Sequence, residues 1–207
     1  MPSPLVKICG ITKLEDALFC SSAGANFLGF IFYTKSPRYI THRHVREIIE
    51  QLPSTVTPVG VFVNESREVI NDIILKTNIR IIQLSGDESP DDCLGYPIDV
   101  WKAFRIDKID EVQQTTAFQI SAALLDGVKG KEYGGTGVPA DISVANEIKK
   151  YHRLVLAGGL NPENVSSMIR QTQPYAIDVN SGVEISPGKK DHNKVKQLFE
   201  NISKNRI

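Results

Sequence analysis

The sequence predicts an α/β protein that folds as a single (β/α)8 TIM barrel over residues 1–207. Three observations carry this prediction, and the first two are that eight short apolar runs recur along the chain and that amphipathic helical patterns lie between most of them. The third is spacing, because eight units in 207 residues leave about 26 residues for each strand, helix and pair of loops. A doubly wound open sheet is the alternative fold.

The apolar runs are expected to be buried parallel strands, because each is continuous in hydrophobicity rather than alternating. Repeated strand–helix units imply a parallel sheet with right-handed crossovers, and eight of them favour closure into a barrel. In chain order the expected strands are Leu5–Cys9, Phe27–Phe32, Pro58–Val63, Arg80–Leu84, Val100–Phe104, Ala122–Leu125, Leu154–Ala157 and Ala176–Val179.

The segments between these strands carry helical patterns. Apolar residues recur at i, i+3, i+4 and i+7 from Val45 to Leu52 and again from Val195 to Ile202. This spacing is typical of helices that bury one face. We expect eight helices in all, of which the one around Ser89–Leu94 is short.

Further signals mark helix ends. Thr12 together with Glu15 resembles a capping box and predicts the start of the first helix. Asn161 followed by Pro162 predicts an N-cap and a first helical residue later in the chain. Pro174 predicts the end of that later helix.

Composition limits the classes of partner. Hydrophobic residues make up 41% of the chain and charged residues 23%, which is typical of a soluble globular protein. The 24 basic and 24 acidic residues balance, which argues against nucleic acid or a membrane as the main partner. Cys9, Cys20 and Cys93 are odd in number and widely spaced, which predicts reduced thiols in the cytoplasm. Because no long exposed apolar stripe is evident, we expect a monomer.

In such a barrel the active site lies at the carboxyl ends of the strands. Cys9 ends the first predicted strand, where a thiol acts as a nucleophile or general base if its pKa is lowered. The alternative is a buried structural cysteine, which is the favoured interpretation of Cys20 and Cys93.

Asp126 follows the sixth strand, where burial raises the pKa of a carboxyl toward neutrality, as a general acid or base requires. The alternative for Asp126 is a helix cap or a loop ion pair.

Small residues follow the last three strands and predict a phosphate site. Barrels often bind phosphate with the loops after strands seven and eight, where backbone amides act as donors. Glycine also lets the backbone approach a ligand closely in the loop 134–137. The alternative is a set of tight turns that require glycine for their own sake. The expected ligand-binding residues of these loops are Gly135, Gly158, Gly159, Asp178, Asn180, Ser181 and Gly182.

Arg38 follows the second strand and is the candidate for binding a carboxylate with two parallel hydrogen bonds, although a solvated loop arginine is the alternative. The histidines all fall near predicted helix ends and away from strand ends. This placement disfavours a metal site and a serine–histidine–aspartate triad. The four histidines are His42, His44, His152 and His192.

Taken together, several ordered motifs that span nearly the whole chain resemble one family, the phosphoribosylanthranilate isomerases of tryptophan biosynthesis. Each motif is weak alone, but the set is highly specific. The motifs are 7–12 (KICGIT), 29–32 (GFIF) with 36–38 (SPR), 59–64 (VGVFVN), 83–84 (QL), 124–126 (LLD), 134–137 (GGTG), 156–160 (LAGGL), 178–179 (DV), 181–184 (SGVE) and 187–191 (PGKKD).

The resemblance implies an isomerase that rearranges N-(5′-phosphoribosyl)anthranilate into 1-(2-carboxyphenylamino)-1-deoxyribulose 5-phosphate. It implies that Cys9 is the general base and Asp126 the general acid of this Amadori rearrangement. It places Arg38 near the anthranilate ring and its carboxylate, and the phosphate at the loops after strands seven and eight. Neither a metal nor an organic cofactor is implied.

The chain departs from the family pattern at two positions: Ser85 stands where a histidine is usual, and Asn180 stands where a serine is usual. Two other functions are therefore considered. Another phosphosugar enzyme, such as an epimerase or a phosphate-binding synthase subunit, would use the phosphate loops but leave Cys9 and Arg38 unexplained. A catalytically silent barrel that binds a phosphorylated ligand has only Ser85 in its favour.

Overall fold

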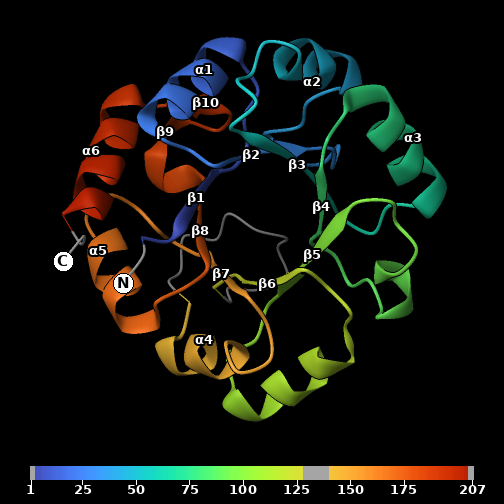
Figure 1. Cartoon of the computed structure of the whole chain (residues 1–207), viewed down its shortest axis with the longest axis vertical. Helices are drawn as coiled ribbons and strands as arrows, with labels where there is room; N and C mark the ends of the chain where they lie inside the picture. Colours follow the sequence, from blue (N-terminus) through green and yellow to red (C-terminus); the bar gives the residue numbers. More distant parts are fainter. Residues whose placement is uncertain (1–2, 128–139, 205–207) are drawn as a thin grey trace.

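The eight predicted strands form a closed parallel barrel in a computed structural model that describes residues 3–127 and 140–204. Each strand pairs with the next along the chain, and the first pairs with the last, so the open sheet is excluded (Figure 1). The strands are β1 (Leu5–Ile8), β2 (Phe27–Ile31), β3 (Thr57–Phe62), β4 (Ile81–Leu84), β5 (Asp99–Phe104), β6 (Ala122–Leu125), β7 (Leu154–Leu156) and β8 (Ala176–Val179).

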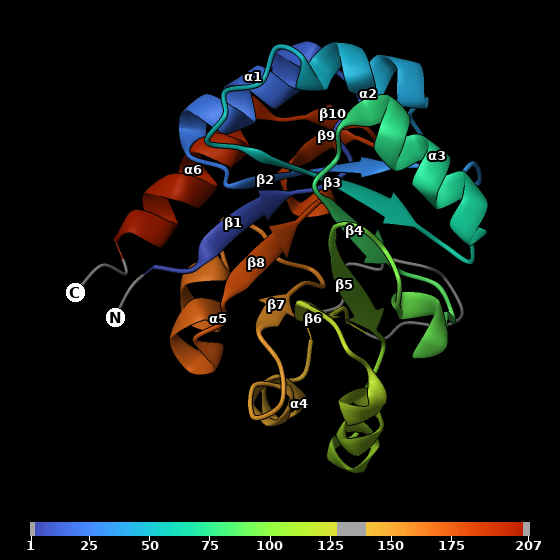
Figure 2. The same cartoon turned by 45° about the vertical axis from the view of Figure 1, so that its right-hand side comes forward.

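Helices surround the barrel and cover the outer faces of its strands (Figures 1 and 2). The short helix expected around residues 89–94 is a single 3-10 turn, and the connection from β5 to β6 is also 3-10 rather than α-helical. Pro90 stands immediately before the first of these turns, in a short connection that leaves little length for an α-helix. The helices are α1 (Leu14–Ala23), α2 (His42–Ile49), α3 (Arg67–Thr77), α4 (Ile142–Ile148), α5 (Val165–Thr172) and α6 (His192–Ser203), with 3-10 helices η1 (Asp91–Cys93), η2 (Ile109–Ala117) and η3 (Ser181–Val183).

The capping box predicted for the first helix is wrong. Lys13 occupies the N-cap of α1 and makes no side-chain capping bond. The Thr12 hydroxyl donates instead to the backbone carbonyl of Gly188, 2.5 Å away. A long-range contact to the other end of the chain has therefore replaced the local cap.

Of the helix ends predicted later in the chain, the start is displaced, because Asn164 and not Asn161 is the N-cap of α5, whereas the end near Pro174 is confirmed. The Asn161 side chain accepts hydrogen bonds from the backbone amides of Glu163 and Asn164, as a capping residue does, although the α-helix proper begins at Val165. Helix α5 ends at Thr172, two residues before Pro174.

Two layers of apolar side chains form the core. The larger layer lies between the strands and the surrounding helices. The smaller layer fills the barrel interior, where the Phe27 and Trp101 rings meet edge to face with centroids 5.0 Å apart. Because this inner layer fills the barrel, a ligand can bind only beyond it, at the carboxyl ends of the strands.

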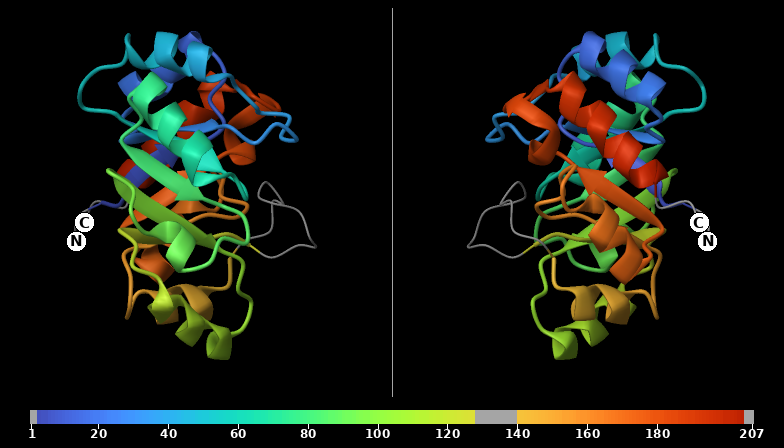
Figure 3. Two further views of the ribbon diagram at one scale, coloured as in Figure 1. Left: turned by 90° about the vertical axis from the view of Figure 1, so that its right-hand side faces the viewer. Right: turned by 90° about the vertical axis from the view of Figure 1, so that its left-hand side faces the viewer.

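A small antiparallel hairpin, not predicted from the sequence, follows β8 and η3. It consists of β9 (Glu184–Ser186) and β10 (Lys189–Lys190). Figure 3 shows it on one side of the barrel, while the start of β1 and the end of α6 lie on the opposite side. Among the described residues, no helix is long and apolar enough to cross a membrane.

Candidate active site

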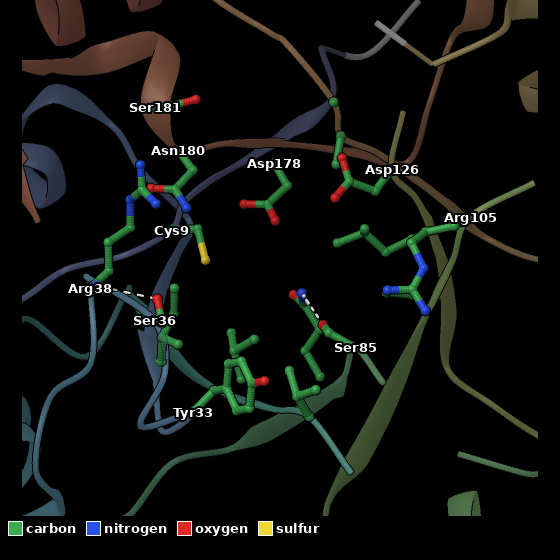
Figure 4. A pocket seen from close by; sticks show the side chains of 18 of the residues that line it. Cys9, Tyr33, Ser36, Arg38, Ser85, Arg105, Asp126, Asp178, Asn180 and Ser181 are labelled. Atoms are coloured by element: carbon green, nitrogen blue, oxygen red, sulfur yellow. Dashed lines mark hydrogen bonds between the residues drawn. The ribbon is translucent and has the colours of Figure 1, made fainter. Parts of the chain in front are cut away.

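A cavity of about 560 Å³ opens at the carboxyl ends of the strands (Figure 4). All eight strands, or the loops directly after them, contribute residues to its wall. This is the location predicted for the active site of a barrel of this kind. Its walls carry both apolar and ionisable side chains, the mixture expected where a polar small molecule must be oriented.

The cavity brings together most of the residues singled out from the sequence. Gly182 does not line it but packs directly behind the loop that follows β7. Gly135 and the rest of the loop 134–137 lie outside the described residues. The predicted residues that line the cavity are Cys9, Arg38, Asp126, Gly158, Gly159, Asp178, Asn180 and Ser181.

Cys9 lies directly after β1, and its side chain faces the cavity while being only 4% exposed. Burial raises the pKa of the thiol above its usual value, the nearby Lys7 ammonium lowers it, and the Asp178 carboxylate raises it again. The balance favours the neutral thiol, whereas a general base must be a thiolate. To act as a base, Cys9 therefore depends on nearby positive charges that lower the pKa of its thiol.

Asp126 lies directly after β6, on the opposite side of Asp178 from Cys9 (Figure 4). Burial raises the pKa of its carboxyl to about 6, and the negative charge of Asp178 adds to the effect. This is the direction expected from the sequence. Such a carboxyl carries a proton in part of the molecules near neutral pH and can give it up, as a general acid must.

Lys7 is a candidate site residue that the sequence analysis did not single out. It is fully buried, and its ammonium donates to the Asp178 carboxylate across the β1–β8 pairing at 2.8 Å. The signal was present in the sequence, because a lysine interrupts an otherwise apolar strand two residues before Cys9. Residues two apart on a strand face the same side.

Arg38 does not extend freely into the cavity. Its guanidinium donates from Nε and Nη2 to the buried carboxylate of Glu184, with a shortest distance of 2.7 Å. Lys190 donates to the same carboxylate at 2.8 Å and to the side-chain oxygen of Asn180 at 3.1 Å. The hairpin thus holds Arg38 at the cavity wall, and its Nη1 makes no hydrogen bond that involves the described residues.

The loops after β7 and β8 approach each other closely. Gly158 and Gly159 adopt left-handed backbone conformations, with φ of 81° and 57°. A side chain at Gly182 would place its Cβ 2.0 Å from the carbonyl oxygen of Leu160. Glycine is therefore required for the two loops to pack against each other, rather than only for a turn within each loop.

Ser85 lies at the end of β4, where the family pattern has histidine. The Gln83 side-chain amide donates to the Ser85 hydroxyl oxygen at 3.0 Å, so the hydroxyl proton can point into the cavity. The Gln83 side-chain oxygen is buried and accepts no hydrogen bond from the described residues. These two groups are the polar part of a wall that is otherwise apolar at β3 and β4.

The remaining cysteines and the histidines lie away from the cavity. Cys20 and Cys93 are buried, and burial raises the pKa of their thiols to about 12 and about 11, in agreement with their interpretation as structural core residues. None of the four histidines lines the cavity. Within residues 3–127 and 140–204, no group of three or more histidine, cysteine, aspartate or glutamate side chains could hold a metal ion.

Comparison with known proteins assigns a family to this fold and site. The family model described as N-(5′-phosphoribosyl)anthranilate isomerase matches residues 6–201. A relative from Trichlorobacter lovleyi, named N-(5′-phosphoribosyl)anthranilate isomerase, is 46% identical over 197 residues, which is 95% of this chain and 96% of that protein.

Solved structures give the same result. A phosphoribosylanthranilate isomerase from Thermus thermophilus superimposes with a TM-score of 0.90 at 35% identity, covering 98% of this chain and 100% of that one. Another structure, with a TM-score of 0.85 at 40% identity over 97% of this chain and 99% of that one, is described as a complex with reduced 1-(o-carboxyphenylamino)-1-deoxyribulose 5-phosphate.

Proposed function

Because the chain belongs to the phosphoribosylanthranilate isomerase family of tryptophan biosynthesis, we propose that it rearranges N-(5′-phosphoribosyl)anthranilate by general acid–base catalysis. The reaction is an Amadori rearrangement that gives 1-(2-carboxyphenylamino)-1-deoxyribulose 5-phosphate. One observation carries the proposed mechanism: a carboxyl with a pKa of about 6 and a thiol face the same cavity from β6 and β1.

In this proposal the phosphate binds between the loops after β7 and β8. Gly158 and Gly159 supply close backbone approach on one side, and 180–182 supply it on the other. A relative whose structure is described as a complex with reduced 1-(o-carboxyphenylamino)-1-deoxyribulose 5-phosphate supports a phosphorylated ligand for this fold. Bound there, the phosphate would hold the ribose across the centre of the cavity.

The anthranilate ring would then lie toward Arg38, whose Nη1 can donate to its carboxylate. Glu184 fixes the guanidinium by binding its other edge, so little conformational freedom is lost when the substrate binds. Asp178, with one carboxylate oxygen free of hydrogen bonds from the described residues, would accept a hydrogen bond from a ribose hydroxyl.

Asp126 acts first in this mechanism. Its carboxyl proton is transferred to the ribose ring oxygen, the bond from C1′ to that oxygen breaks, and the anthranilate nitrogen forms a C1′=N iminium. Because the pKa of Asp126 is raised to about 6, the carboxyl retains this proton in part of the molecules near neutral pH.

Cys9 acts second. Its thiolate removes the proton on C2′, and the electron pair moves toward the iminium nitrogen to give an enolamine. The enolamine gains a proton at C1′ and loses one from the C2′ hydroxyl, which leaves the ketone. Because the iminium accepts the electrons, the proposed steps use no metal or organic cofactor.

The test follows turnover of N-(5′-phosphoribosyl)anthranilate by the loss of anthranilate fluorescence. Cys9→Ala and Asp126→Asn are each expected to lower kcat by about 10²–10⁴-fold, because each removes one proton-transfer group. Cys20→Ala is the matched control, since it removes a buried thiol outside the cavity, and it should retain activity. Turnover at the native rate in both Cys9→Ala and Asp126→Asn would contradict the mechanism.

A further inference from the structure

The proposed reaction needs an arrangement of protons that is the reverse of the ordinary order of acid strengths. Cys9 must be a thiolate while Asp126 carries a proton, although a thiol is ordinarily a weaker acid than a carboxylic acid. Both groups are buried, and burial raises the pKa of each. Charged groups in the site must therefore shift the pKa of Cys9 and the pKa of Asp126 in opposite directions.

Lys7 and Asp178 are the charged pair placed to do this. The Lys7 ammonium is buried beneath the cavity and binds Asp178 at 2.8 Å. Burial alone would lower the pKa of Lys7, but Asp178 and Cys9 outweigh it and raise that pKa, so Lys7 is charged. Lys7 lies on β1 and Asp178 lies on β8, and the two residues are direct partners in the pairing of these strands.

The ammonium end of this pair lies beside Cys9. An added Cβ at Gly29 on β2 would lie 2.7 Å from the Cys9 sulfur and 3.0 Å from the Lys7 nitrogen, so the two atoms flank the same small space. Lys7 and Cys9 also face the same side of β1, because they are two residues apart. The absence of a side chain at Gly29 therefore leaves room for the ammonium to approach the sulfur.

The carboxylate end lies between Cys9 and Asp126 (Figure 4). One Asp178 oxygen binds Lys7, while the other is buried, accepts no hydrogen bond from the described residues and belongs to the cavity wall. The pair is thus an oriented dipole, with its positive end at the sulfur and its negative end toward the Asp126 carboxyl.

Building on the proposed function, we propose that Lys7 and Asp178 are positioning residues whose ion pair shifts the balance of protons toward protonated Asp126 and ionised Cys9. Lys7 does this without touching the substrate, because it is buried below the cavity. Asp178 does it in addition to any hydrogen bond it makes to the ribose.

The charges around each group agree with this assignment. For the pKa of Cys9, the lowering effect of Lys7 outweighs the raising effect of Asp178, and Lys190 on β10 adds a smaller lowering effect. For the pKa of Asp126, the raising effect of Asp178 comes directly after that of burial, while Arg105 and Lys7 lower it by less. Each end of the dipole therefore acts mainly on the group next to it.

The experiment measures the pKa of the Cys9 thiol without substrate. Intact enzyme is treated with iodoacetamide over a range of pH, and the rate of alkylation at Cys9 is followed by mass spectrometry of its peptide. The variants are Lys7→Met, Asp178→Asn and the double variant, with the fold checked by circular dichroism. Lys76→Met is the matched control, because Lys76 forms a surface ion pair with Asp72 on α3.

The two single variants should move the Cys9 pKa in opposite directions. Lys7→Met should slow alkylation at pH 7 by about tenfold, and Asp178→Asn should accelerate it, since an adjacent charge shifts a pKa by about one unit or more. A purely structural role would not give shifts of opposite sign. Lys76→Met should leave the profile unchanged.

Equal profiles, or shifts of the same sign, in Lys7→Met and Asp178→Asn would overturn the inference. If Lys7→Met does not fold, the double variant is compared with Asp178→Asn, and the added Lys7→Met change must slow alkylation there too. Because alkylation needs no turnover, the two proposals fail separately. Opposite shifts in a native enzyme that lacks activity would contradict the proposed function, while full activity without shifts would contradict this inference.

Discussion

At the scale of single residues, the site depends on carboxyls and a thiol that sit in unfavourable surroundings. Asp126 is buried next to another carboxylate, and both effects raise its pKa to about 6. A group held in this way stores a proton for the reaction at the expense of stability once it ionises. The same residue should therefore be visible in a stability measurement as well as in turnover.

Asp126→Asn is expected to stabilise the protein at high pH. The folded pKa of about 6 lies above the ordinary aspartate value of 3.8, so the stability contributed by the protonated carboxyl is full below pH 3.8 and is lost as the pH rises through 6. Urea unfolding should show the variant to be about 2 kcal/mol more stable than the native protein at pH 8 and no more stable at pH 4.

Asp107→Asn is the control for this prediction, because Asp107 is an exposed aspartate in the connection that follows β5. It should change stability by the same small amount at both pH values. A stability difference for Asp126→Asn that does not depend on pH would contradict the raised pKa.

Strand ends with a reactive group marked Cys9 and Asp126 as candidate site residues, since each follows an apolar run. The roles proposed for them came from the family resemblance. Lys7 was missed because its importance depends on Asp178, which is 171 positions away along the chain. The Glu184 partner of Arg38 was missed for the same reason, because a bidentate ion pair between distant loops leaves no local pattern.

At the scale of elements, the strands were easier to predict than the helices. A buried parallel strand is a continuous apolar run, and all eight runs are strands. The 3-10 form of η1 and η2 was not predicted, because short polar connections carry little periodicity. The β9–β10 hairpin was missed because only two or three residues of each strand pair.

The close packing of the loops after β7 and β8 predicts that a larger residue at Gly182 weakens substrate binding. Gly182→Ala forces these loops apart, because its Cβ would meet the Leu160 carbonyl at 2.0 Å. A displacement of about 1 Å in substrate-positioning groups costs about 10²-fold in kcat/KM, and most of it should appear in KM because the proposed phosphate site is affected. Steady-state kinetics should show this rise together with weaker inhibition by inorganic phosphate.

Ser186→Ala provides the comparison, since Ser186 is exposed in the neighbouring hairpin and lines no part of the cavity. Its KM should be that of the native enzyme. A native KM in Gly182→Ala as well would mean that the phosphate does not bind between these loops.

At the scale of the whole molecule, the barrel is closed by contacts between the two ends of the chain. β1 pairs with β8, and α1 packs against α6. Buried Asp16 on α1 joins these ends by accepting from the Lys190 backbone amide at 3.0 Å and bonding the His192 ring at 2.9 Å. Phe19 stacks on the same ring with centroids 3.9 Å apart.

Asp16→Ala should therefore destabilise the folded protein. It leaves the buried Lys190 backbone amide without its acceptor, which costs about 1–3 kcal/mol, and it also removes the contact with His192. The free energy of unfolding in urea should fall by about 2 kcal/mol or more. Glu15→Ala, an exposed neighbour on the same helix, should change it by less than about 0.5 kcal/mol.

The isotope effect for substrate deuterated at C2′ tests the central claim of ordered acid and base roles most directly. It is measured on kcat/KM in Cys9→Ser and in Asp126→Asn. If Cys9 removes the C2′ proton, that step becomes limiting in Cys9→Ser, which should show a full primary isotope effect. If Asp126 opens the ring, ring opening becomes limiting in Asp126→Asn, and the effect should vanish there. A vanishing effect in Cys9→Ser together with a full effect in Asp126→Asn would contradict the assignment of the two residues.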